Sequence, residues 1–214
     1  MESSILTLEA QINSYNFFST FFREKPSKEW LNSALEFVTN WGESSSPEEG
    51  GENNEIYSLL HQQLLEMIQK SGLDNYREFL RQEYERLFFA PGRVLVNLYE
   101  SAYSGSGLLM QDTTVNVRQH YLRAGLVVKS LYSIPDDHIA TELEFMHFLS
   151  KRILELVRQD SAQENIHEIM VWRSDFFSEH LKLWTPALAE TIKTNSMDPF
   201  FQLMSMGLKF LVEE

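Results

Sequence analysis

A short acidic run in the second half of the chain offers the clearest possibility of chemistry. His138 and Glu142 are four residues apart, so on a helix they share one face, and Asp136 and Asp137 directly precede them. Imidazole and carboxylate groups at this spacing are typical of half of a divalent metal site. The same residues are typical of a helix start, where their side chains accept hydrogen bonds from unpaired N–H groups. The other histidines offer no matching second half, so capping is the simpler interpretation and we predict no metal site.

A second candidate is an aromatic and leucine stripe. Tyr84, Leu87 and Phe88 have the i, i+3, i+4 spacing of one helix face. Such a stripe is ordinary core packing in many helices. It is also the pattern of an apolar groove that takes an amphipathic or apolar peptide. The spacing alone leaves both interpretations open.

Familiar catalytic and nucleotide motifs are missing. Gly105-Ser106-Gly107 lacks the third glycine of a dinucleotide fingerprint, and the chain has neither a P-loop nor a Gly-x-Ser-x-Gly elbow. The absence of cysteine excludes disulfides, iron–sulfur clusters and a cysteine nucleophile. These absences disfavour P-loop nucleotide binding and cysteine chemistry. We expect no catalytic residue and no cofactor.

The charge of the chain points to a basic partner. Its 214 residues include 18 Lys and Arg against 31 Asp and Glu, a net charge of −13. This balance disfavours nucleic acid and anionic membranes as partners and suits a cationic peptide, whose arginines pair with carboxylates through two parallel hydrogen bonds. No apolar run approaches the roughly 20 residues of a membrane span, and the N-terminus lacks the pattern of a secretory signal. We expect a cytoplasmic protein with no stable membrane insertion.

The elements that must position these residues are helices. Leucine occurs 28 times against 20 for valine and isoleucine together, and glycine plus proline account for only 15 residues. Thr185-Pro186 and Asp198-Pro199 are typical helix starts, whereas the 90–112 connection is longer than an ordinary loop. We predict an all-α, single-domain helical bundle of about nine or more helices over 1–214, with a possible hinge near 132–138. The expected helices cover about 6–23, 27–41, 54–70, 74–89, 113–131, 136–158, 162–183, 186–195 and 199–212.

Several segments together resemble a known family. The sequence reads EYERLFFAPG over 83–92, YESAY over 99–103 and PDDHIATELEFM over 135–146. Between and after them lie YLRAGL over 121–126, HLKLWTP over 180–186 and PFF over 199–201. In order and separation these segments resemble the TorD/DmsD family of redox-enzyme maturation chaperones. The resemblance covers about residues 75–205.

The resemblance implies an all-helical chaperone without enzymatic turnover. Such chaperones bind the twin-arginine signal peptide of a molybdenum-cofactor enzyme and hold the apoenzyme in the cytoplasm until the cofactor is inserted. It also implies that the Pro-Asp-Asp-His segment and the aromatic stripe bind the peptide. Two adjacent guanidinium groups need carboxylates, and the apolar segment behind them needs a groove. The expected peptide-binding set is Tyr84, Leu87, Phe88, Tyr99, Tyr103, Pro135, Asp136, Asp137, His138 and Glu142.

Two alternatives remain beside this interpretation. The first is a chaperone of a non-exported nitrate-reductase-type subunit, whose peptide has no working twin-arginine motif. The second is a metal-dependent hydrolase that uses Asp136, Asp137 and His138, with Glu142 one turn later. The resemblance also allows either a monomer or a domain-swapped homodimer.

Overall fold

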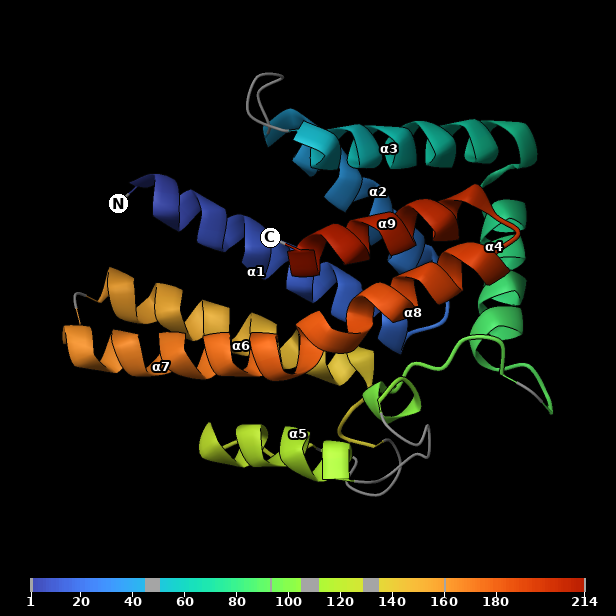
Figure 1. Ribbon diagram of the computed structural model, residues 1–214. Coiled ribbons are helices and arrows are strands. Elements are labelled where there is room, and N and C mark those ends of the chain that lie inside the picture. Colours follow the sequence, from blue (N-terminus) through green and yellow to red (C-terminus); the bar gives the residue numbers. More distant parts are fainter. Residues whose placement is uncertain are drawn as a thin grey trace. The chain divides into compact units, whose positions relative to one another are not determined.

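The fold is given by a computed structural model that describes residues 2–44, 51–92, 94–104, 112–128, 135–159 and 161–213 (Figure 1). Throughout these ranges the regular structure is helical, and an isolated antiparallel bridge joins Tyr99 to His138. The expected all-α class is confirmed. None of the helices in these ranges combines the length and the apolar character needed to cross a membrane. The α-helices are α1 Glu2–Arg23, α2 Lys28–Ser44, α3 Gly51–Ser71, α4 Leu73–Phe88, α5 Asp112–Arg123, α6 Ile139–Arg158, α7 Gln163–Phe176, α8 Lys182–Asn195 and α9 Pro199–Glu213.

Two short helical segments complete the described structure. The 3-10 helix η1 covers Glu100–Ala102, and the π-helix η2 covers Phe177–Leu181. Because α7, η2 and α8 follow one another without interruption, they form one continuous helical element. Counted in this way, the described ranges hold eight α-helical elements, slightly below the nine or more predicted.

The chain divides into two compact units. The first unit consists of Met1–Phe22 and Leu98–Thr185, and the second of Arg23–Asn97 and Pro186–Glu214. The expected hinge at 132–138 lies inside the first unit, and its residues 132–134 are outside the described residues. A single domain with that hinge therefore stays a prediction.

The second unit has an aromatic core. α3 packs against α2 and α9, and α4 packs against α3. The Phe200 ring lies 5.6 Å from that of Trp30, and the Phe201 ring lies 6.4 Å from that of Phe88. Together with Leu87, which is fully buried, these side chains remove a large apolar area from water and so stabilise the unit.

The first unit has its own aromatic cluster where α5, α6 and α7 meet. The Phe145 ring lies 4.8 Å from both Tyr121 and Phe176, and Phe176 lies 5.0 Å from the imidazole of His180. The Phe145 contacts are edge-to-face, the arrangement that aromatic rings prefer. This cluster places α5 beside the polar residues described below.

Three helix ends test the expected boundaries. α5 ends at Arg123, well before the predicted end at 131, because Gly125 adopts φ +74° and closes the helix in the left-handed conformation. The predicted helix start at Thr185-Pro186 is wrong, since α8 begins at Lys182 and continues through the proline, which removes only one N–H donor. The predicted start at Asp198-Pro199 is confirmed, since the Asp198 carboxylate accepts the Phe200 N–H at 2.8 Å.

Candidate functional site

The acidic turn, Pro135–His138, leads into α6 and pairs with residues 98–100, in the middle of the long 90–112 connection. The Glu100 N–H donates to the Asp137 carbonyl at 2.9 Å, and the Ile139 N–H donates to the Leu98 carbonyl at 2.9 Å. Residues 105–111 of that connection lie outside the described residues. Two segments far apart in sequence are therefore held side by side by backbone hydrogen bonds.

His138 caps α6, as the capping interpretation predicted for it, whereas Asp136 and Asp137, which were expected to cap the helix as well, have other partners. Its Nδ1 accepts the Ala140 N–H at 3.1 Å, and its carbonyl accepts the Glu142 N–H at 3.0 Å. A ring nitrogen that accepts a hydrogen bond carries no proton, so the neutral ring holds its proton on Nε2. Since the Nδ1 lone pair is engaged in this way, His138 serves the helix start, and the i, i+4 pair with Glu142 does not form half of a metal site.

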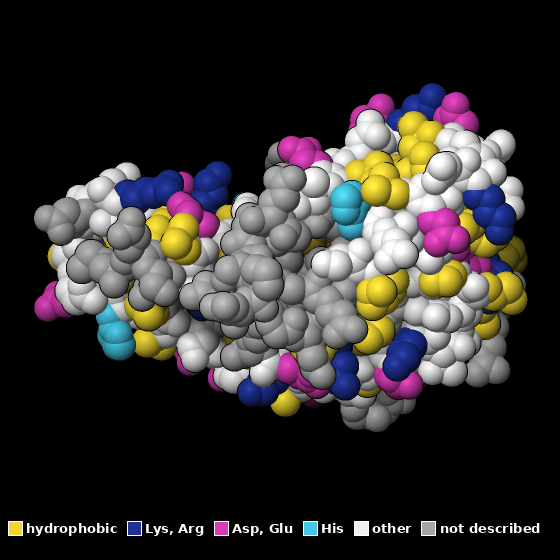
Figure 2. Space-filling model, turned by 90° about the horizontal axis from the view of Figure 1, so that it is seen from above, with side chains coloured by type: hydrophobic (Ala, Val, Ile, Leu, Met, Phe, Trp, Pro, Cys, Tyr) yellow, Lys and Arg dark blue, Asp and Glu magenta, His cyan; other side chains and the backbone are white. Residues whose placement is uncertain are grey.

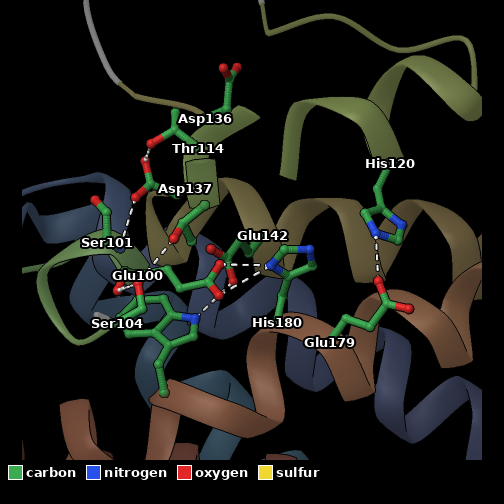
Figure 3. A network of polar contacts seen from close by, with 12 residues as sticks. Glu100, Ser101, Ser104, Thr114, His120, Asp136, Asp137, Glu142, Glu179 and His180 are labelled. Atoms are coloured by element: carbon green, nitrogen blue, oxygen red, sulfur yellow. Dashed lines mark hydrogen bonds and ion pairs between the residues drawn. The ribbon is translucent and has the colours of Figure 1, made fainter. Parts of the chain in front are cut away.

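Asp137 points into the protein and holds three segments together. Its carboxylate accepts the Ser101 N–H at 3.0 Å and the Thr114 hydroxyl at 3.1 Å, and no part of the residue reaches solvent. Ser101 belongs to η1 and Thr114 to α5 (Figure 3). Both hydrogen bonds are charge-assisted and buried, so Asp137 is a structural anchor of the acidic turn.

The Asp136 side chain points away from that of Asp137 (Figure 3) and meets Arg118 of α5. The Asp136 Oδ2 atom accepts a hydrogen bond from Nε of Arg118 at 2.6 Å and forms an ion pair with Nη2 of the same guanidinium at 2.5 Å. The carboxylate side chain is 5% exposed, whereas that of Arg118, on α5, is 44% exposed. The Tyr121 hydroxyl donates to the Asp136 carbonyl at 3.0 Å and fixes the backbone beneath the pair. A half-exposed guanidinium from this chain therefore covers a buried carboxylate whose backbone is fixed.

Beneath the acidic turn lies a buried acid cluster, which we define as Glu100, Glu142, His180 and Trp184. His180 Nδ1 lies 2.9 Å from Glu100 Oε2, and the Trp184 indole N–H donates to Glu142 Oε2 at 3.1 Å. All four side chains are buried, so any charge among them depends on these partners for its stabilisation.

The surroundings of Glu142 in this cluster favour its protonated form. Burial raises the pKa of Glu142 well above its usual range, and the nearby carboxylates of Glu100 and Asp137 raise it further. As a carboxylate, its Oε1 would have no donor among the described residues, whereas as an acid it shares a hydrogen bond with Glu100. A residue expected to attract arginines is therefore an interior group that solvent does not reach.

The stripe residues belong to the second unit and form part of its core. Tyr84 is 1%, Leu87 0% and Phe88 5% exposed, and Tyr84 and Phe88 pack edge-to-face at 4.9 Å. The expectation that they line an open apolar groove is corrected, because neighbouring side chains fill the space around them. The structure thus brings the acidic turn and Glu142 together in the first unit but does not place the stripe in that unit.

The remaining predicted residues border the acidic turn. The Tyr99 ring lies 5.1 Å from His138, and the Tyr103 ring lies 5.5 Å from Trp184. Tyr99, Tyr103 and Pro135 are each partly exposed, so their outer edges reach solvent. They can contribute contact area to a bound peptide, whereas Asp137 and Glu142 cannot in this conformation.

Sequence reasoning missed Glu100, Thr114, Arg118, His180 and Trp184. A signal existed for His180 and Trp184, which stand in the HLKLWTP segment, and for Glu100, which stands in YESAY. The sequence held no signal for Arg118 or Thr114, because their role depends on how α5 lies against the acidic turn.

An apolar groove of about 920 Å³ lies elsewhere in the first unit, between α1, α6 and α7. Its walls include Leu8, Ile153, Val157 and Met170. Met170 is 51% exposed, so the groove is open to solvent. On the face drawn in Figure 2, exposed hydrophobic side chains lie in small groups between charged ones. A lined groove can bury more of an apolar segment than such small groups can.

Comparison with known proteins identifies the family. The family model described as Nitrate reductase delta subunit matches residues 51–190. A relative from Vibrio cholerae serotype O1, named Chaperone protein TorD, is 31% identical over 111 residues, which are 52% of this chain and 49% of the relative. Chaperone protein TorD from Vibrio parahaemolyticus is 29% identical over 115 residues, 53% of this chain and 52% of that protein. The chain thus spans about half the length of these curated relatives.

A solved structure supports the fold. A protein from Archaeoglobus fulgidus that is assigned to redox enzyme maturation matches with a TM-score of 0.55 and 18% identity, covering 95% of this chain and 94% of that one. The curated relatives are named as chaperones and not as enzymes. The chain therefore belongs to the nitrate reductase delta subunit family, the TorD-type family of redox-enzyme maturation chaperones.

Proposed function

We propose that this chain is a cytoplasmic chaperone that binds the twin-arginine signal peptide of an apo-molybdoenzyme and holds the enzyme for cofactor insertion before export. Family membership supports the chaperone role, and the naming of its relatives supports a redox-enzyme client. The net charge of −13 favours a cationic ligand. The finer assignment, an arginine-bearing peptide, rests on the geometry around Asp136.

The single observation that carries the proposal is the Asp136–Arg118 pair. A buried carboxylate meets a half-exposed guanidinium at 2.5–2.6 Å, which is the contact that an arginine of a client peptide would make. Asp136 is already fixed by the Tyr121 hydroxyl, so little ordering is required when the guanidinium is exchanged. Arg118 thus occupies, in the unbound chain, the position that a client arginine takes in the complex.

The apolar part of the signal peptide finds a second contact in the same unit. Ile153 in the groove lies 17 residues along the chain from Asp136, nearly all in α6, which corresponds to about 25 Å at 1.5 Å per residue. An extended peptide advances about 3.3 Å per residue, so roughly eight residues cover that length. The spacing suits a ligand whose arginines are followed by an apolar segment.

Calorimetric titration with paired peptides tests this proposal. One peptide carries two adjacent arginines before an apolar segment, and the other carries glutamines in place of both arginines. We expect the wild-type chain to bind the arginine peptide more tightly, and Asp136→Asn to abolish most of that preference. Asp175→Asn is the matched control, because Asp175 is a surface carboxylate paired with Arg123 in the same unit. Equal affinity of the wild type for both peptides would refute the arginine assignment.

A second candidate, a chaperone of a non-exported nitrate-reductase-type subunit, is favoured by the description of the matching family model. Such a client offers no working twin-arginine motif, so binding would depend on the apolar groove. Met170→Ala, at an exposed groove position, would then weaken the binding of both peptides equally and Asp136→Asn would change the binding of neither.

The chain is expected to act as a monomer or a domain-swapped homodimer, which light scattering distinguishes.

A further inference from the structure

Outside the acidic turn, two histidines and a glutamate of the first unit come together at the surface. They are His120 near the end of α5 and the neighbouring Glu179 and His180 of η2 (Figure 3). One ligand atom from each lies within 4.8 Å of the others. His120 Nε2 is 3.2 Å from Glu179 Oε2, and the two imidazole rings are 5.1 Å apart at 86°.

The π-helix explains how adjacent residues can serve one site. In an α-helix, successive side chains diverge by about 100°, which would turn Glu179 and His180 toward different surroundings. The wider turn of a π-helix reduces that angle to about 80°, so the two side chains lie closer together. Single π-turns of this kind inside helices occur frequently at functional sites.

Glu100 prepares His180 to act as a ligand. The Glu100 carboxylate lies 2.9 Å from Nδ1 of His180 and accepts a hydrogen bond from that nitrogen when it carries the ring proton. In this tautomer the free lone pair of the imidazole is on Nε2. Both residues are about 4% exposed, which keeps this contact dry. A carboxylate behind a histidine is the usual arrangement that orients a metal-bound imidazole and raises its basicity.

The surroundings of His120 favour the same role. The Phe176 ring packs against both imidazoles, at 5.4 Å from His120 and 5.0 Å from His180, and restricts their rotation. The Glu179 side chain is 61% exposed, so an ion can enter from solvent.

We propose that His120, Glu179 and His180 form a binding site for a divalent transition metal, with Zn²⁺ as the ion that the donor set fits best. Two imidazole nitrogens and one carboxylate oxygen are a three-ligand set that zinc accepts, with water at the fourth position. Ligand atoms around tetrahedral zinc lie about 3.3 Å apart, and the 3.2 Å separation between His120 and Glu179 already matches this spacing. The ion ties the end of α5 to the π-helix.

Zinc titration of the full chain, expressed without a histidine tag and dialysed against chelator, tests the proposal. A chromophoric chelator that competes for Zn²⁺ reports the affinity, and Co²⁺ in place of zinc reports a four-coordinate site through its visible absorption bands. We expect one Zn²⁺ per chain. We expect His120→Ala and Glu179→Gln to abolish that binding, and Glu100→Gln to weaken it by about 10–100-fold. His167→Ala, which removes an exposed histidine of α7, is the matched control and leaves the affinity unchanged.

Two results would overturn the proposal. One is a wild-type chain that competes with the chelator no better than buffer. The other is a Glu179→Gln variant that binds zinc as the wild type does. Glu179 is largely exposed, so its substitution leaves the fold intact, and circular dichroism verifies this for each variant.

Discussion

Removing the Asp137 carboxylate should destabilise the first unit strongly, because two buried donors would lose their partner. In Asp137→Ala the Ser101 N–H and the Thr114 hydroxyl, now 3.0 and 3.1 Å from the carboxylate, have nothing to replace it. Ser101 is 2% and Thr114 6% exposed, so water does not reach either donor readily. Each unpaired buried group costs about 1–3 kcal/mol. The expected loss is about 2–6 kcal/mol, a large part of the stability of an ordinary domain.

Urea unfolding followed by circular dichroism measures this loss. Thr114→Val removes only one donor and should cost about 1 kcal/mol, since the carboxylate keeps the Ser101 N–H. Asp137→Ala should cost less in the Thr114→Val background than in the wild type, because one of the two stranded donors is already gone. Asp112→Ala, at an exposed aspartate of α5, is the control and should cost less than about 1 kcal/mol. The reasoning is refuted if Asp137→Ala and Asp112→Ala lose the same stability.

Three further perturbations have defined outcomes. Because the pKa of Glu142 is raised, the folded chain keeps a proton that the unfolded chain releases above about pH 4.5, so the free energy of unfolding falls as pH rises. In urea unfolding between about pH 5 and 8, Glu142→Gln should flatten this dependence and stabilise the chain at the upper end of the range. Leu87→Ala should cost about 2–5 kcal/mol in thermal melts, whereas Leu122→Ala, at a 55% exposed position, costs under about 1. Glu83→Gln should cost about 1.5–3 kcal/mol at pH 7. Although burial opposes the shift, hydrogen bonds from Arg86 and the Met197 N–H hold the pKa of the Glu83 carboxylate below its usual value. The difference in stability from wild type should therefore persist down to about pH 4.5 and shrink as the pH falls further and Glu83 takes up a proton.

The helices could be predicted from the sequence because they depend on local signals. The start of α9 at Pro199 follows from Asp198, which is readable as a helix cap before proline. The start of α6 was predicted about three residues early, at 136, because His138 and not an aspartate caps that helix. The end of α5 depends on the conformation of Gly125, and α8 depends on its continuity with the π-helix. Neither is visible in the periodicity, so both boundaries were misplaced.

The candidate site could be located but not oriented from the sequence. The acidic turn was identified from Asp136, Asp137 and His138, yet only the structure separates their roles. Asp136 pairs with the half-exposed Arg118, whereas Asp137 points into the interior. The stripe from Tyr84 to Phe88 failed as a groove for a physical reason. An amphipathic pattern fixes which side chains avoid water, not whether a protein core or a ligand covers them.

The geometry also changes which substitution can test how the chain recognises arginine. From the sequence, Asp136 and Asp137 were equally expected to bind the peptide. Because Asp137 is an interior anchor, Asp137→Ala weakens the fold and hence the binding of any peptide. Asp136, which already holds a guanidinium, is the residue at which charge recognition can be separated from stability.

The affinity of Arg118→Ala for a twin-arginine peptide tests the central claim most directly. Removing Arg118 leaves the carboxylate of Asp136 without its guanidinium partner, so a peptide arginine no longer has to displace it. Because this pair is partly exposed, the expected gain in binding free energy is about 1 kcal/mol, or roughly fivefold tighter binding by calorimetry. Arg123→Ala is the matched control, since Arg123 lies on the same helix, is 49% exposed and pairs with a different carboxylate. The account predicts tighter binding in Arg118→Ala alone. Unchanged or weaker binding in Arg118→Ala, or an equal gain in both variants, would contradict it.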